Sequence, residues 1–373
     1  MHETIAETGL HHTKHRRVFQ HVHRAIVEGQ YTAGQKLPSD CQLMRRFDTS
    51  RPTVARAMRD LEQAGLIERR PGSGSYVRAP AAARTSLFGL LIPGLGETEI
   101  FEPICGELAR CCQRQNFNLL WGGSSLAADS GQEQQAEALA GRYIEQRVAG
   151  VFFAPVELTS HMRAVNRRVA AALDQAGIAV ILLDRDLEDF PERSRFDLVG
   201  IDNFRAGYAQ AKYFLSAGCK RIHYLARLRS ATTVDARIAG YQRALTDHGI
   251  AADGGWVHRG EPDDAAFVGP IVEQRPEAVL CANDITAGHF MRTLIHLGVR
   301  VPDDVRVMGV DDVKYAQLFS VALTTLRQPC REMGAAAVAA MVQRLENRHL
   351  PARDILLDFQ LVVRESCGVR RAR

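Results

Sequence analysis

The sequence predicts an α/β protein in two parts, an N-terminal winged helix-turn-helix followed by a two-lobed body of doubly wound parallel sheets. Three observations lead to this prediction. Residues 14–78 contain three short helical patterns and a glycine hairpin, residues 87–367 alternate apolar strand runs with helical patterns, and the alanine-rich segment 79–86 between them has the composition of a linker. At 373 residues the chain is long enough for two or three such units.

Three helices are expected in the first part. The first covers residues 14–28, where apolar side chains recur at helical spacing until a glycine ends the pattern. Ser39 is placed to cap a second helix that runs to Phe47, and Ser50 is placed to cap a third that runs to Ala64. The next stretch, LIERRPGSGSYVR, reads as two short strands around a glycine hairpin, which completes a winged helix-turn-helix.

The positive charge of the chain is concentrated in this head. Residues 1–84 hold 14 Lys and Arg against 8 Asp and Glu, a net of +6, whereas the remaining 289 residues hold 33 against 35, a net of −2. A basic head on a nearly neutral body indicates that only the head meets a polyanion. The plainer alternative is a solvated basic face, which is the weaker interpretation because the helices and the wing occur in the order of a DNA-binding unit.

The third helix is expected to lie in a major groove of duplex DNA with its first residues at the base edges. Arg51 can bind guanine through two hydrogen bonds, and Thr53 can contact a base edge or a phosphate. Other arginines are better placed for phosphates, and the hairpin glycines let backbone amides approach the sugar-phosphate chain. The residues expected at DNA are Ser39, Arg45, Arg46, Ser50, Arg51, Thr53, Arg56, Arg59, Arg70, Gly72, Ser73 and Gly74.

About 65 residues of the head resemble the GntR family of bacterial regulators. The segment LPSDCQLMRRFDTSRPTVARAMRDLEQAGLIERRPGSGSYV follows the family pattern L-P-S-E-R-x-L, S-R-x-T-V-R-x-A-L, L-x-x-x-G-L-I and G-x-G-T-x-V. Two family arginines that touch DNA are replaced here by Cys41 and Ala55. Arg56 points about 100° away from position 55 around the helix, so the resemblance implies an operator preference that differs from the family's.

Polar residues follow the apolar strand runs of the body. Several of these runs, such as GVFFAP and AVILLD, are apolar throughout, as expected for parallel strands covered on both faces. Ligands of such sheets bind beyond the carboxyl ends of the strands. Those ends carry Pro93, Asp184-Arg185, Asp202-Asn203, Asn283-Asp284 and Asp311-Asp312.

The order of these strand ends resembles the sugar-responsive core of LacI/GalR repressors, which is similar to periplasmic sugar-binding proteins, over nearly all of residues 86–367. VGIDNFRAGYAQAKYFLSAGCKRIHYL follows one family pattern, and AVLCANDITAGHFMRTLIHLGVRVPDDVRVMGVDD with LTTLRQP follows another more closely. GntR heads on LacI-type cores occur in arabinose-type repressors. The expected parts are a flexible tail (1–13), the head (14–78), a linker (79–86), a periplasmic-binding-protein-like body (87–367) and a basic tail (368–373). Within the body, lobe 1 is expected at about 87–195 and 328–352, and lobe 2 at about 196–327 and 353–367.

The LacI/GalR resemblance implies effector contacts in the body. Arg237 offers a forked donor, Asn283 and Asp311 offer acceptors for vicinal hydroxyls, and Phe101 can supply an apolar face for a sugar ring. The further candidates are Glu157, Asp184, Thr233 and Gln328.

Two features of the body qualify these contacts. Each aspartate at a strand end could instead cap a helix; capping is the preferred interpretation for Asp202 and a ligand role for Asp311. Sugar-binding members of the resembled family often carry an aromatic residue after "GD", whereas this chain reads GEPDD at 260–264. A stacking partner is therefore missing or supplied elsewhere.

Together these patterns predict a ligand-responsive regulator, a repressor in the resembled group. It is expected to bind double-stranded operator DNA as a homodimer, because two-fold pairing of subunits mirrors a palindrome. A small sugar-like effector between the lobes would change the DNA affinity, and no cofactor is expected. Whether the effector releases or strengthens DNA binding is not encoded in these patterns, although release is the commoner expectation for the resembled group.

Other classes of protein are less consistent with the sequence. No apolar run reaches the about 18 residues that cross a bilayer, and the N-terminus lacks the apolar core of a secretory signal, so a cytoplasmic location is expected. The alternative of a sugar-binding transport component would need export and leaves the basic head unexplained. The turn PGLGETE is no dinucleotide fingerprint and no nucleophile elbow occurs, so no enzyme is expected.

Metal binding is a weaker possibility. The eight cysteines form no C-x-x-C pair, which indicates neither a zinc finger nor a disulfide framework. The N-terminal histidines could serve a metal sensor, but a solvated tail is the preferred interpretation. These histidines are His11, His12, His15, His21 and His23.

Overall fold

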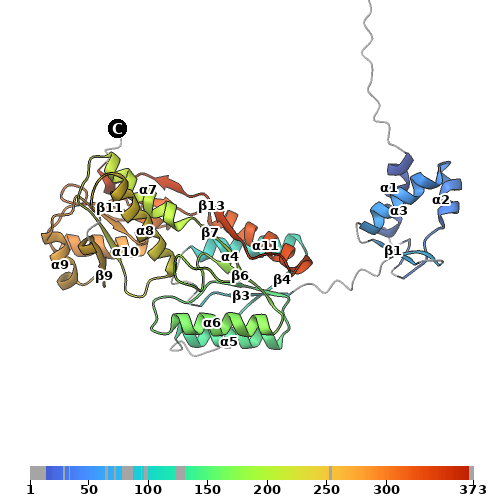
Figure 1. Cartoon of the computed structure of the whole chain (residues 1–373), viewed down its shortest axis with the longest axis horizontal. Helices are drawn as coiled ribbons and strands as arrows, with labels where there is room; N and C mark the ends of the chain where they lie inside the picture. Colours follow the sequence, from blue (N-terminus) through green and yellow to red (C-terminus); the bar gives the residue numbers. More distant parts are fainter. Residues whose placement is uncertain are drawn as a thin grey trace, which may run out of the picture. The chain divides into compact units, whose positions relative to one another are not determined.

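A computed structural model of the chain contains two compact units, residues 1–84 and 85–373 (Figure 1). The structure describes residues 14–27, 30–32, 34–63, 66–70, 73–77, 87–93, 95, 100–122, 131–251 and 254–368. The expected N-terminal tail, linker and basic tail therefore lie outside the described residues, apart from Gly368. No helix within the described ranges is both long and apolar enough to span a bilayer.

The head contains three helices and a two-stranded wing, in the order that the sequence predicts. They are α1 (Lys14–Val27), α2 (Asp40–Phe47), α3 (Arg51–Gln63), β1 (Ile67–Arg70) and β2 (Gly74–Val77). The strands pair antiparallel, with Arg70 opposite Gly74 at the tip. One side of each helix packs into a common core, which contains Val18, Val22, Leu37, Leu43, Val54, Ala57, Met58, Leu61, Ile67 and Val77. The opposite sides of the helices remain in solvent.

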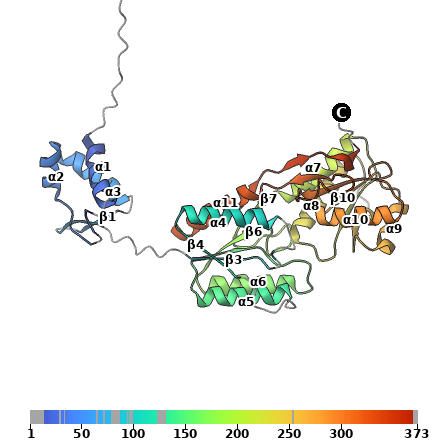
Figure 2. The ribbon, with the colours of Figure 1, turned by 180° about the vertical axis from the view of Figure 1, so that it is seen from behind.

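Lobe 1 of the body is a six-stranded sheet covered by helices on both faces. Its strand order is β13-β7-β6-β5-β3-β4, and every pair is parallel. Its elements are β3 (Leu87–Leu91), α4 (Phe101–Arg114), β4 (Asn118–Trp121), α5 (Gln132–Glu145), β5 (Gly150–Phe153), α6 (Met162–Gln175), β6 (Ala179–Leu183), β7 (Asp197–Ile201), α11 (Cys330–Glu346) and β13 (Asp354–Leu357). Helices α4 and α11 cover one face and α5 and α6 cover the other, which explains why the residues of β5 are all buried (Figure 2).

Lobe 2 repeats this arrangement, with strand order β14-β12-β11-β10-β8-β9 and only β14 antiparallel to its neighbour. Its elements are α7 (Asn203–Ser216), β8 (Ile222–Ala226), α8 (Thr232–Asp247), η1 (Gly254–Trp256), β9 (Val257–Arg259), α9 (Ala265–Glu273), β10 (Ala278–Cys281), α10 (Asp284–His296), β11 (Arg306–Asp311), β12 (Thr324–Arg327), β14 (Gln360–Val362) and η2 (Glu365–Cys367). Helices α7 and α8 pack on one face and α9 and α10 on the other.

The chain passes between the lobes three times, after β7, after β12 and after β13. The expected lobe boundaries differ from the sheets, because they place β7 and β13 in lobe 2, whereas both strands pair within the sheet of lobe 1. The expected boundary at residue 195 lies before β7, yet strand pairing in the sheet of lobe 1 continues through Ile201. Here lobe 1 therefore means residues 87–201 and 330–357, and lobe 2 means residues 203–327 and 360–367.

A buried ion pair joins α11, β7 and β13 in lobe 1. Asp197 is fully buried and lies 2.9 Å from Arg344 Nη2 and 3.3 Å from Arg353 Nη2. Burial alone would raise the pKa of Asp197, but hydrogen bonds from Arg353 and Arg344 outweigh burial and hold this pKa below its usual value. The carboxylate is therefore ionised, and it ties the returning C-terminal segment to the sheet.

Replacement of Asp197 by Asn is expected to lower the free energy of unfolding of the body by about 3–5 kcal/mol, because two arginines lose their buried counter-charge. Both tryptophans of the chain, Trp121 and Trp256, lie in the body, so their fluorescence during urea unfolding reports on this unit alone. Asp354 pairs with Arg193 at the surface, and Asp354→Asn as the matched control should cost at most about 1 kcal/mol. Equal losses in the two variants would contradict the structural role of Asp197.

Candidate functional site

The outer surface of the head carries a group of exposed arginines on α2 and α3. Arg51 begins α3, and Thr53 lies half-buried in the first turn of the helix. The group comprises Arg45, Arg46, Arg51, Arg56 and Arg59. None of these five arginines forms an ion pair with another described residue. Their charge is therefore not neutralised within the head, as a phosphate-binding surface requires.

The helix starts differ in how they are capped. The Ser39 hydroxyl accepts from the Gln42 backbone amide at 3.3 Å, and the Gln42 side chain accepts from the Ser39 amide at 2.7 Å. This capping box confirms the expected start of α2. The Ser50 hydroxyl instead lies 2.9 Å from the Thr53 hydroxyl, which places two hydroxyl groups beside Arg51 at the start of α3.

The wing presents a polar tip. Ser73 and Gly74 are exposed, and the Ser73 hydroxyl lies 2.7 Å from the Tyr76 hydroxyl. Arg70 forms an ion pair with Glu68, and its guanidinium lies 4.6 Å from the centre of the Tyr76 ring. Arg70 is thus held close to the wing, unlike the arginines of α3, and Gly72 lies outside the described residues.

The two positions that depart from the GntR pattern lie on the helices of this surface. Cys41 is exposed in the first turn of α2, and Ala55 is half-buried in α3. Neither side chain can donate the hydrogen bonds of an arginine to phosphate or base. The charge of this surface comes from neighbouring positions instead.

The second group of candidates converges between the lobes of the body. Glu157 follows β5, Asp184 follows β6 and Asp311 ends β11, so strand ends of both sheets bring carboxylates together. One small cavity of about 30 Å³ is lined by seven of the eight expected effector residues: Glu157, Asp184, Thr233, Arg237, Asn283, Asp311 and Gln328. Phe101 lines an adjoining cavity of about 130 Å³ together with Glu157 and Asn283.

Helix capping accounts for two of the polar strand ends. The Asp202 side chain accepts from the Arg205 amide at 2.9 Å and caps α7, which confirms the preferred interpretation of this residue. Asn283 caps α10 in the same way, because its Oδ1 accepts from the Thr286 amide at 2.9 Å. The Oδ1 that was expected to serve a ligand is therefore engaged, and the amide nitrogen of Asn283 is the group left for the cavity.

Arg237 is anchored from lobe 2. Its Nε donates to Asn203 Oδ1 at 2.7 Å, and its Nη1 donates to the backbone carbonyl of Ala282. Gly207 is required beside it, since a Cβ at that position would lie 1.8 Å from the Arg237 carbonyl oxygen. The guanidinium thus reaches the cavity in a fixed orientation.

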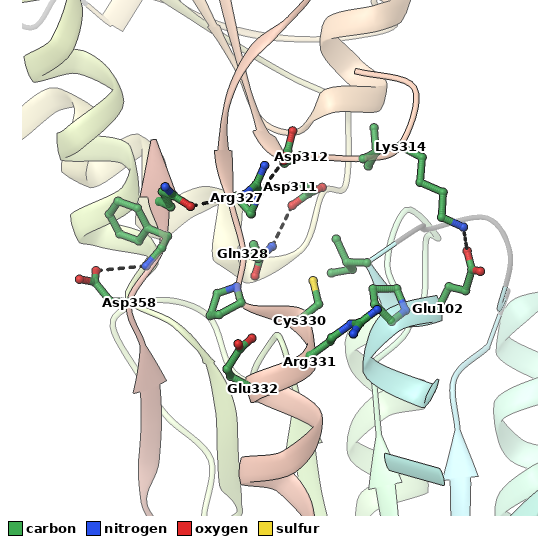
Figure 3. Close-up of a pocket in the computed structure, with 16 residues that line it drawn as sticks. Glu102, Asp311, Asp312, Lys314, Arg327, Gln328, Cys330, Arg331, Glu332 and Asp358 are labelled. Carbon is green, nitrogen blue, oxygen red and sulfur yellow. Dashed lines mark hydrogen bonds and ion pairs between the residues drawn. The ribbon is translucent and has the colours of Figure 1, made fainter. Parts of the chain in front are cut away.

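Asp311 and Gln328 meet where β11 and β12 end. Gln328 donates from Nε2 to Asp311 Oδ1 at 2.8 Å (Figure 3). Burial raises the pKa of Asp311 to about 7, although Arg237 and the Gln328 hydrogen bond act in the opposite direction. Burial also raises the pKa of Asp184, against the attraction of Arg185 and Arg237. A carboxyl group in this centre therefore exchanges its proton near neutral pH.

The prediction of effector residues from sequence did not include Arg185. This side chain is only 5% exposed, and it forms ion pairs with Glu157 and with Asp184, whose Oδ2 lies 3.3 Å from its Nε. Its guanidinium lies 5.5 Å from the centre of the Phe101 ring. The position of Arg185 directly after the apolar run AVILLD indicates the end of a strand, where ligands bind. The sequence does not show, however, that Arg185 is buried beside the charged Asp184.

The GEPDD segment supplies no aromatic ring, as its sequence indicated. Glu261 forms an ion pair with Arg227 at 3.2 Å, and the carbonyl of Pro262 accepts from Thr293 at 2.9 Å. The aromatic face at the centre of the body is that of Phe101, and it is covered by Arg185.

Direct contacts hold the two lobes together around this centre. The Leu158 amide donates to the Arg229 carbonyl at 2.9 Å, and the Ala231 amide donates to Glu157 Oε2 at 3.2 Å. On the other side, Lys314 donates to Glu102 at 2.5 Å across a larger cavity of about 690 Å³ beside the crossing segments (Figure 3). Asp312 in that cavity wall binds Arg327 and Arg364 and so ties the strands of lobe 2 together.

The histidines form no metal site within the described ranges, where no group of three or more metal-ligating side chains occurs. His15 lies 2.7 Å from Asp60 and links α1 to α3, and His21 packs on Phe47. His11 and His12 lie outside the described residues.

Family models and similar proteins agree with this architecture. The model for bacterial regulatory proteins of the gntR family matches residues 14–77, and a periplasmic binding protein-like domain matches residues 211–367. The arabinose metabolism transcriptional repressor of Geobacillus stearothermophilus is 26% identical over 370 residues, which cover 95% of this chain and 97% of that protein. The HTH-type transcriptional repressor PurR of Vibrio atlanticus is 28% identical over 319 residues, 84% of this chain and 90% of that protein.

Solved structures show the same fold. A complex of the transcriptional regulator CelR with cellobiose matches with a TM-score of 0.65 at 22% identity. The match covers 85% of this chain and 91% of the CelR chain. A LacI-family regulator of Sanguibacter keddieii matches with a TM-score of 0.59 at 27% identity. The match covers 76% of this chain and 100% of the chain of that regulator.

A winged helix-turn-helix with unpaired arginines, joined to a two-lobed body with a polar centre, defines the class of ligand-responsive transcriptional regulators. More particularly, the chain joins a gntR-family helix-turn-helix domain to a periplasmic-binding-protein-like domain and is homologous to the arabinose and PurR repressors. These homologues are transcriptional regulators rather than enzymes.

The raised pKa of Asp311 predicts a pH dependence of stability. Between about pH 4 and pH 7 the unfolded chain releases this proton while the folded chain keeps it, so stability falls as the pH rises through this range. The loss approaches about 4 kcal/mol for a carboxyl group raised this far. Asp311→Asn removes the ionisation and keeps the oxygen that Gln328 binds, so urea unfolding should show a weaker fall. Parallel pH profiles for the two proteins would contradict the assignment.

Proposed function

We propose that the protein is a cytoplasmic repressor that binds operator DNA as a homodimer and releases it when a small sugar-like effector binds between the lobes. The observation that carries this proposal is the convergence of eight predicted polar and aromatic residues from both lobes on one buried centre. The same chain carries a head in which the exposed arginines of α2 and α3 form no ion pair with any described residue. The names of its homologues support the class of activity.

The head supports DNA binding through the chemistry of α3. Arg51 stands at the N-terminal end of this helix, where a recognition helix contacts base edges in the major groove. Arg56 and Arg59 lie further along α3 and are exposed, so they can reach the phosphates on either side of the groove. Ser73 and Gly74 at the wing tip offer a hydroxyl and a backbone amide for the sugar-phosphate chain.

The body supports effector binding through the closeness of its lobes. The central cavities of about 30 and 130 Å³ are smaller than the about 300–1,000 Å³ of ordinary ligand pockets. A sugar can therefore enter only if the lobes separate or the side chains of the centre move. A ligand that contacts both lobes then has different affinities for the open and closed arrangements, which is the requirement for coupling to DNA.

The coupling needs a dimer to have its full effect. Two heads bound to a two-fold operator must keep a fixed separation, and a change in lobe closure within each body would alter that separation. The homologue from Geobacillus stearothermophilus is described by its name as a repressor of arabinose metabolism. Pentoses and hexoses are therefore the first effectors to test on this chain.

Arg51→Ala is expected to weaken operator binding by about 1–3 kcal/mol and to relax the base preference at one position of each half-site. Arg59→Ala should instead weaken binding to every sequence and reduce the salt dependence of the affinity by about one counterion. Fluorescence anisotropy with labelled duplexes at several salt concentrations measures both effects. Arg110→Ala changes an arginine of the body that pairs with Glu107, and it serves as the control that leaves binding unchanged.

Arg237→Lys is expected to abolish the response to effector while the protein still binds operator DNA. A lysine cannot bind Asn203 and Ala282 while also presenting a second donor edge to a ligand. The measurement is an operator-shift assay with the full chain and a panel of pentoses, hexoses and nucleosides. If no small molecule changes the DNA affinity of the unmodified protein, the sensing role is wrong.

A further inference from the structure

The centre between the lobes contains an almost balanced set of buried charges. Three carboxyl groups, those of Glu157, Asp184 and Asp311, face two guanidinium groups, those of Arg185 and Arg237. Asp184, Arg185 and Arg237 are at most 5% exposed, so water screens these charges poorly. With one carboxyl group protonated the centre carries no net charge.

Each cation of this centre already has its counter-charges or acceptors. Arg185 lies between Glu157 and Asp184, and Arg237 binds Asn203 and the Ala282 carbonyl. Neither guanidinium stands alone as a binding site for an anionic group. This arrangement differs from an anion site, in which arginines or backbone amides exceed the carboxylates.

Several buried polar atoms of the centre lack a hydrogen-bond partner among the described residues. They are Asp184 Oδ1, Gln328 Oε1, and Nε and Nη1 of Arg185. The two Arg185 nitrogens contact the carboxylates of Asp184 and Glu157 as ion pairs, but without the geometry of a hydrogen bond. Acceptors and donors thus occur side by side. A hydroxyl group, which both donates and accepts, can satisfy such a mixed set, whereas a carboxylate or phosphate supplies acceptors alone.

We propose that the Glu157–Arg185 pair makes this cleft selective for uncharged polyhydroxylated ligands over their carboxylate or phosphate derivatives. The inference rests on the proposed function of the cleft and adds the chemical class of its ligand. Arg185 covers the Phe101 ring, and Glu157 and Asp184 balance its charge, so a ligand hydroxyl would share the Arg185 N–H groups with these carboxylates. An anionic ligand would add an uncompensated negative charge to the buried centre, which is costly unless a further proton is taken up.

The ligand class is tested by isothermal titration calorimetry on the full chain with matched pairs of sugars. The pairs are glucose with glucuronate, galactose with galacturonate, ribose with ribose 5-phosphate, and glucose with glucose 6-phosphate; arabinose and xylose are added as neutral pentoses. We expect at least one neutral sugar to bind, and its anionic counterpart to bind on the order of 100-fold more weakly. An anionic counterpart that binds as tightly or more tightly overturns the inference and leaves the proposed sensing function intact. If neither class binds, the proposed function itself fails.

A variant tests the role of Glu157 directly. Glu157→Gln keeps the size of the side chain and leaves Arg185 with a single counter-charge, so an anionic ligand can supply the missing one. We expect the preference for the neutral member of a pair to fall by at least about tenfold. Glu137→Gln, which breaks a surface ion pair with Arg168 in the same lobe, should leave the preference unchanged.

Two results contradict the role of Glu157. The first is an unchanged preference in Glu157→Gln, and the second is an equal change in both variants. Tryptophan fluorescence establishes that each variant is folded before titration. If Glu157→Gln does not fold, the ratio of affinities in the unmodified protein still decides the ligand class.

Discussion

The body of this protein is organised around one centre of buried charges to which both lobes contribute. Glu157, Asp184 and Arg185 come from the strand ends of lobe 1, whereas Arg237 and Asp311 come from lobe 2. Arg185 is held by Glu157 and Asp184 within lobe 1, and Arg237 is held by Asn203 and Ala282 within lobe 2. Burial of charged groups is costly, so this contact limits how the lobes can close rather than simply stabilising the body. A ligand that entered this centre would have to replace those interactions group by group, which is the physical basis of the proposed selectivity.

Backbone strain is concentrated around the same centre. Asp184 and Asp311 have φ values of 68° and 115°, and Leu158 and Arg229, which hydrogen-bond across the lobes, have φ values of 62° and 57°. Such conformations are unfavourable for residues with a side chain and persist where the surroundings impose them. The loops that meet at the centre are therefore held in these conformations by the surrounding contacts.

The head and the body differ in how their arginines are paired. Among the described residues of the head, Arg45, Arg46, Arg51, Arg56 and Arg59 on α2 and α3 have no carboxylate partner, which favours contact with a polyanion. The body instead pairs its arginines, from Arg185 and Arg237 in the centre to Arg344 at Asp197. Under the proposed function a metabolite would be recognised in a nearly neutral environment and DNA in a positive one, so the two ligands would not compete for the same chemistry.

From the sequence alone one can predict the order of elements in the head, the N-cap at Ser39, the alternation of strands and helices in the body, and the set of strand ends that meet. These features are local, because helical spacing, caps and apolar runs are written in neighbouring residues. Three features became visible only in the folded structure. Strands β7 and β13 complete the sheet of lobe 1, the side-chain oxygen of Asn283 caps α10, and Arg185 is buried over the Phe101 ring. Each of these depends on residues far apart in the chain: strand pairing, burial and the balance of charge are properties of the packed lobes, which no short stretch of sequence contains.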